Sequence, residues 1–89
     1  MKEPYLEVTY RHGHPLAAYF YLPRTARQKS VRTRRVEPGL IIDFAANGQP
    51  IGIEITAPAQ LTLPVFNRVL RDLGCAPARR VDLAPLRAA

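Results

Sequence analysis

Two carboxylates, Asp43 and Glu54, are candidates for a shared polar site, because each falls in one arm of a predicted hairpin. Residues 40–44 and 51–55 flank Asn47-Gly48, a pair that favours a tight hairpin turn. Apolar residues alternate with the two carboxylates, so both acids are expected on the outer sheet face. There they could share a proton or hold a cation. Alternatively, Glu54 pairs with an arginine of a neighbouring strand or binds a backbone donor near the turn.

A second candidate is the pair His12 and His14, which flank Gly13 in a predicted turn. Alternate residues of an extended chain can approach one metal ion, and Glu7 or Asp43 could add a ligand. A zinc site needs three or four ligands, and no third ligand stands at a diagnostic spacing. We therefore expect no metal and no cofactor, and we leave the role of the two histidines open.

The third candidate is a basic stretch, residues 24–35, which holds six cations and no acid: Arg24, Arg27, Lys29, Arg32, Arg34 and Arg35. In its second half, the residue types alternate as they do along a β-strand. If Val31 and Thr33 face inward, Arg32 and Arg34 point toward the outer sheet face, where Tyr19 and Tyr21 are also expected. Cations interleaved with aromatic rings could follow a phosphate backbone and stack on bases.

Three interpretations of this basic stretch are open. The chain carries 13 Lys and Arg against 7 Asp and Glu, a formal charge of +6, which attracts nucleic acid. An acidic protein surface would be attracted in the same way. The charges could also be ordinary surface, since arginines on an edge strand discourage unwanted strand pairing.

Nucleophilic catalysis has little support in the sequence. Cys75 follows Gly74, at the expected negative end of a helix and far from either histidine. Ser30, the single serine, lies among cations with no positioned base. The glycines are dispersed and form no phosphate-binding loop. We expect no enzyme.

These residues are positioned by five predicted strands, over residues 6–10, 17–22, 30–36, 40–44 and 51–55. Thr62 is expected to cap a helix that begins near Pro64 and ends near Leu73, with Gly74 in the left-handed conformation. The predicted fold class is α+β, a small, largely antiparallel sheet of four or five strands packed by one C-terminal helix.

The predicted helix has one apolar stripe, formed by Leu63, Phe66, Leu70 and Leu73. Val65 and Val69 lie beside it. They either broaden the contact with a curved sheet or form half of a two-fold interface, and we favour the interface because a small domain gains most from extra burial. We expect one globular domain over residues 1–74 and a flexible Ala/Pro/Arg-rich tail over residues 75–89.

Length and composition exclude several classes of protein. Eighty-nine residues make one small domain, and 47% apolar residues are typical of a globular chain. No apolar run approaches the 18 or so residues of a membrane span. The first residues carry no apolar signal core, and the single cysteine allows no internal disulfide. We therefore expect a cytoplasmic protein, most simply a homodimer.

Three segments resemble the motifs of a known family. Ala17-Ala18-Tyr19-Phe20-Tyr21-Leu22, Pro38-Gly39-Leu40-Ile41-Ile42-Asp43-Phe44 and Gly48-Gln49-Pro50-Ile51-Gly52-Ile53-Glu54-Ile55 are similar to the domain of unknown function 2283 family of small prokaryotic proteins. The resemblance covers about residues 5–73, and it implies a small antiparallel sheet backed by a helix. Some members resemble the antitoxin half of toxin–antitoxin pairs. Residues 11–16 depart from the acidic loop usual at this place in the family.

Together, the residues and the resemblance predict a small non-catalytic interaction module. We expect it to bind a protein partner, in the manner of an antitoxin, through the basic stretch together with Tyr19 and Tyr21. The alternative is a nucleic-acid-binding protein that uses residues 24–35. The pair Asp43 and Glu54 is kept as a possible polar site.

Overall fold

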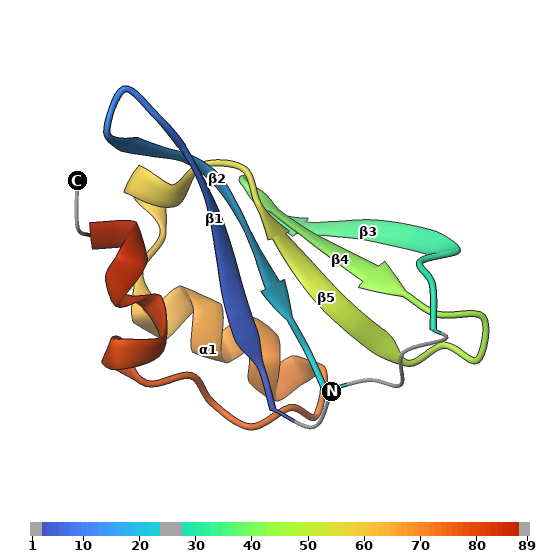
Figure 1. Ribbon diagram of the computed structural model, residues 1–89. Helices are drawn as coiled ribbons and strands as arrows, with labels where there is room; N and C mark the ends of the chain where they lie inside the picture. The colour runs from blue at the N-terminus through green and yellow to red at the C-terminus, as the bar shows by residue number, and fades with distance from the viewer. Residues whose placement is uncertain (1–2, 24–27, 88–89) are drawn as a thin grey trace.

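The computed structural model describes residues 3–23 and 28–87 and has the predicted α+β architecture (Figure 1). Within these residues, a five-stranded antiparallel sheet is covered on one side by one α-helix and two 3-10 helices. The elements, in chain order, are β1 (Tyr5–Arg11), β2 (His14–Tyr21), β3 (Arg32–Glu37), β4 (Leu40–Phe44), β5 (Pro50–Ile55), η1 (Pro58–Gln60), α1 (Leu63–Asp72) and η2 (Arg80–Arg87).

The strand order is β1-β2-β5-β4-β3, so the N-terminal hairpin joins the β3–β4–β5 meander through the pairing of β2 with β5. Tight turns join the antiparallel neighbours that are consecutive in the chain. His12 and Gly13 both have positive φ between β1 and β2. The Asn47-Gly48 turn joins β4 to β5, and the Asn47 side chain accepts a hydrogen bond from the Gln49 amide at 2.9 Å. β1 and β3 form the two edges.

One face of the sheet forms the core. The three isoleucines of β5, Ile51, Ile53 and Ile55, are fully buried, and alternate residues of β2 and β4 lie beside them. Phe66 of α1 packs edge-on against Phe20 of β2, with ring centroids 5.0 Å apart. The alternation of buried apolar residues along β4, together with the isoleucines at every second position of β5, thus fixes which face receives the helix.

The predicted helix is confirmed, including both of its ends. The Thr62 hydroxyl accepts a hydrogen bond from the Val65 amide, and Gly74 has a φ of 74° after the last turn. Val69 is buried against the sheet and Val65 is partly buried in the same core. The predicted use of Val69 in a two-fold interface is therefore wrong, because its side chain broadens the contact with the sheet; the use of Val65 in such an interface stays a prediction.

The predicted tail is the largest correction to the fold. Over the described part of residues 75–89, the chain turns back as η2 and buries Ala78, Leu83 and Leu86 in the core. The side-chain amide of Asn67 in α1 both accepts from and donates to the backbone of Ala78, at 2.7 and 3.1 Å. The Tyr10 hydroxyl of β1 donates to the Pro85 carbonyl at 3.0 Å. This segment therefore completes the layer that covers the sheet, and the packed unit continues past residue 74.

Candidate interaction surfaces

The cations of β3 divide between the two faces of the sheet. Arg32 is paired with Phe44 and Arg34 with Ile42, both of which point into the core, so these two arginines lie on the helix side. Their guanidinium carbons lie 5.0 and 5.2 Å from the centroid of the Phe44 ring. Arg35 is paired with Ile41 and lies on the opposite, open face.

The expected placement of Arg32 and Arg34 on the outer face, beside Tyr19 and Tyr21, is therefore wrong. The register of β3 is set at its C-terminal end, where the pairing with β4 shifts between Arg35 and Glu37. Val36 packs against the core, and alternate residues of a strand share a face. Of the two residues expected to face inward, Thr33 is paired with Asp43 on the open face and Val31 is exposed.

The basic stretch is otherwise exposed where the structure describes it. Lys29, Arg32, Arg34 and Arg35 are solvent-exposed, and Arg24 and Arg27 lie outside the described residues. The ion pairs of the described residues are Arg68 with Glu37 and Arg79 with Asp82. Neither pair neutralises a cation of β3, so this edge strand presents concentrated positive charge.

The open face of the sheet carries a tyrosine cluster. The Tyr5 and Tyr21 rings stack with centroids 5.1 Å apart, and Tyr19 meets Tyr21 edge-on at 4.7 Å. Both the Tyr5 and the Tyr21 hydroxyls donate to the carboxylate of Glu7, at 3.4 and 3.3 Å. The cluster therefore spans the two neighbouring strands β1 and β2, and α1 and η2 lie on the other side of the sheet (Figure 1).

Asp43 and Glu54 share this open face, as expected, but they do not form a pair with each other. The Tyr19 hydroxyl donates to the Asp43 carboxylate at 2.6 Å. Tyr19 reaches Asp43 by lying directly over Gly52 of β5, the residue paired with Asp43. Glu54 lies diagonally from Asp43, opposite Tyr19 and Ile41, and is exposed. Sequence reasoning missed the Tyr19–Asp43 bond, for which the glycine between them was the available signal.

The histidines and carboxylates form no metal site where the structure describes them. His12 and His14 are exposed at the tip of the β1–β2 hairpin. Over residues 3–23 and 28–87, no group of three or more His, Cys, Asp or Glu side chains comes together as metal ligands would. Within the same residues, no helix has the length and hydropathy needed to cross a membrane.

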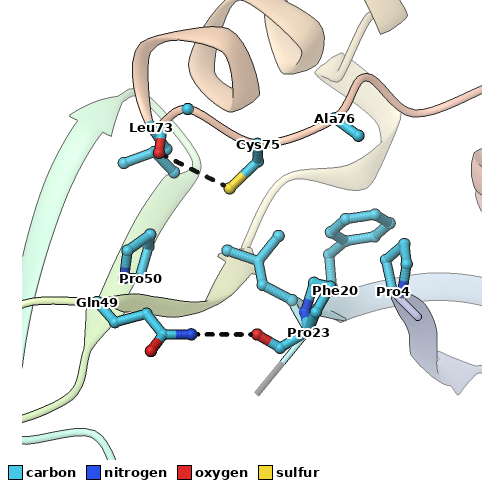
Figure 2. A pocket seen from close by; sticks show the side chains of 10 residues that line it. Pro4, Phe20, Pro23, Gln49, Pro50, Leu73, Cys75 and Ala76 are labelled. Carbon is cyan, nitrogen blue, oxygen red and sulfur yellow. Dashed lines mark hydrogen bonds between the residues drawn. The ribbon is translucent and has the colours of Figure 1, made fainter. Parts of the chain in front are cut away.

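An open-sided, mostly apolar pocket of about 380 Å³ lies at one end of the sheet, below the end of α1 (Figure 2). Its polar atoms are already in use: the Gln49 amide donates to the Pro23 carbonyl at 3.3 Å, and the Cys75 thiol contacts the Leu73 carbonyl. Burial raises the pKa of the Cys75 thiol, which keeps it protonated at neutral pH. The described lining residues place no base beside this thiol, so the pocket does not activate it as a nucleophile.

Comparison with known proteins gives one match. Searches of curated proteins and of solved structures return no match to this chain. A family model matches residues 17–57, which comprise most of β2 and all of β3, β4 and β5 but neither β1 nor α1. This range is narrower than residues 5–73, over which the sequence motifs suggest the resemblance. It contains Tyr19, Asp43 and Glu54. Over these residues the chain resembles the family described as Protein of unknown function (DUF2283).

Proposed function

We propose that this protein is a non-catalytic interaction module that binds a protein partner through the basic edge strand β3. The observation that carries the proposal is the position of Arg32 and Arg34. Both guanidinium groups rest on the ring of Phe44, at the sheet edge, with no ion pair to an acid of the described residues. Two like charges kept close together favour a negatively charged occupant.

The edge itself supports a protein partner. An edge strand has unpaired backbone donors and acceptors, to which an extended segment of another protein can add as a further strand. Acidic side chains of such a segment would meet Arg32 and Arg34 on one face and Arg35 on the other. Charge-assisted hydrogen bonds from arginine to carboxylate then add specificity to the backbone pairing.

Nucleic acid is the second candidate, because the same guanidinium groups could bind neighbouring phosphates. The separation of Tyr19 and Tyr21 from Arg32 and Arg34 argues against base stacking at this edge, since the tyrosines lie on the opposite face. We therefore place the protein partner first. An antitoxin-like role is what the family resemblance implies, and the cytoplasmic location that we also propose is compatible with the free thiol of Cys75.

The experiment is a pull-down from the lysate of the native cell, with and without nuclease, using the wild-type chain and two matched variants. The test variant changes Arg32, Arg34 and Arg35 to Gln. The control variant changes Arg11, Arg71 and Arg80 to Gln, and it loses the same charge at exposed sites outside β3. We expect a protein that survives nuclease treatment and is captured by the control variant but not by the test variant.

Other outcomes separate the candidates. Capture of nucleic acid that is lost after nuclease, with an affinity that falls steeply with salt, would replace the protein partner by nucleic acid. Equal capture by both variants would remove β3 as the binding surface. Light scattering of the purified chain tests the expected homodimer independently of either partner.

A further inference from the structure

The open face of the sheet carries a charge opposite to that of the whole chain. The strand register arranges its side chains in two rows across the five strands. The first row is Tyr5, Tyr21, Gly52, Asp43 and Thr33, and the second is Glu7, Tyr19, Glu54, Ile41 and Arg35. Three carboxylates against one guanidinium give the two rows a net charge of −2, in a chain of net charge +6.

The tyrosines of this face are fixed and partly exposed. Hydrogen bonds from two of their hydroxyls to Glu7, and from Tyr19 to Asp43, hold the phenol ends of the rings. Tyr5 keeps 49% of its surface exposed, although it stacks on Tyr21. A rigid ring whose position is already set loses little conformational entropy when a partner packs on it.

Tyrosine rings beside carboxylates match the chemistry of arginine. A guanidinium group can lie flat on an aromatic ring and donate two parallel hydrogen bonds to a carboxylate. Glu54 is exposed and is paired with Tyr19 in the register of β2 and β5, while Glu7 is paired with Tyr19 from β1. A lysine can supply the charge but not the planar stacking.

We propose that the open face, defined by these two rows, docks an arginine-rich segment of a partner protein. The surface is distinct from the basic edge at Arg32 and Arg34, which lies on the helix side and attracts acidic groups. The charge of the face selects a cationic occupant, and the ring surface favours arginine over lysine. The inference does not depend on the function proposed for β3.

A hexa-arginine peptide is the probe, at physiological salt, with binding measured by calorimetry and by tyrosine fluorescence. The chain has four tyrosines and no tryptophan, and three of the four lie on this face, so the fluorescence reports the site directly. We expect Glu54→Gln to weaken binding about threefold, and Glu54→Gln with Tyr5→Leu about tenfold. Hexa-lysine should bind several-fold more weakly than hexa-arginine.

Asp72→Asn is the matched control, since Asp72 is an exposed carboxylate of α1 on the other side of the sheet. It should leave the affinity within about twofold. Thermal unfolding checks that each variant is folded. The variant with Gln at Arg32, Arg34 and Arg35 should bind the peptide at least as tightly as the wild type, although the β3 partner is lost. This difference separates failure of this inference from failure of the proposed function.

Three results would overturn the proposal. The first is the absence of hexa-arginine binding to the wild-type chain. The second is an equal loss of affinity in Asp72→Asn and Glu54→Gln, which would indicate diffuse attraction. The third is a dimer in light scattering that Tyr5→Leu dissociates, which would assign the open face to a second copy of this chain.

Discussion

Replacement of Gly52 by alanine tests the geometry of the open face. A Cβ atom on Gly52 would lie 2.1 Å from the Tyr19 hydroxyl oxygen and 2.3 Å from the carbon that bears it. Neither distance is tolerable, so the Tyr19 ring must move off β5. That movement breaks the 2.6 Å hydrogen bond from Tyr19 to Asp43.

The net effect follows from two opposing contributions. Loss of a hydrogen bond to a charged acceptor costs about 1.5–3 kcal/mol. Alanine in a strand interior is favoured over glycine by about 0.5–1 kcal/mol, because it restricts the unfolded chain. We expect Gly52→Ala to lower the free energy of unfolding by about 1 kcal/mol, which is a fall in Tm of about 4–8 °C for a chain of this size.

Urea unfolding at pH 7 measures this cost in two backgrounds. In the wild-type background the full effect is expected. In an Asp43→Asn background the acceptor is neutral and the bond is worth only about 0.5–1.5 kcal/mol, so the cost of Gly52→Ala should fall close to zero. An equal cost in both backgrounds, or a gain in stability in the wild-type background, would refute the contact of Tyr19 with Asp43 across Gly52.

Further predictions concern the C-terminal segment. Leu86→Ala should lower the free energy of unfolding by about 2–3 kcal/mol in urea unfolding, because Leu86 is buried in the core. Val81→Ala, at an exposed position, should change the free energy of unfolding by less than about 0.5 kcal/mol. Equal effects of the two substitutions would indicate a loose tail. Asn67→Ala should cost about 1–3 kcal/mol, since the Ala78 amide loses its acceptor, and hydrogen exchange at Ala78 should accelerate. The hydrogen bond from Arg79 lowers the pKa of Asp82 below its usual range. The stabilisation from Asp82 is therefore present above the pKa of the unfolded chain and is lost as the pH falls through the lower, folded value. An NMR titration in which Asp82 titrates at or above about 3.9 would contradict this assignment.

The short-range features of the fold could be predicted from sequence because they depend on neighbouring residues. The Asn47-Gly48 turn, the alternation of isoleucines in β5, and the cap at Thr62 each follow from local conformational preferences. The presence of Asp43 and Glu54 on one face follows from the same alternation. The antiparallel α+β architecture was therefore predictable.

The packing of the C-terminal segment could not be predicted from local conformational preferences. Residues 75–87 contain few large apolar side chains, and their composition favours a loose segment. Leu83 and Leu86 become core residues only because β1, β2 and α1 leave a surface for them, and Asn67 fixes the chain there through Ala78. Burial of so few side chains can only be judged once the surface that receives them is known.

The candidate surfaces also combine features that follow from the sequence with features that depend on the tertiary structure. Composition and spacing are enough to establish that the chain is basic, that the cations of residues 24–35 are concentrated, and that tyrosines occur at alternate positions of β2. Which faces these side chains occupy depends on how the strands pair and pack. A shift of one residue in strand pairing exchanges the two faces of a strand, and the shift at Val36 depends on its contact with the core. Periodicity therefore revealed which residues of β3 share a face, while packing against the core determined which of the two faces is theirs.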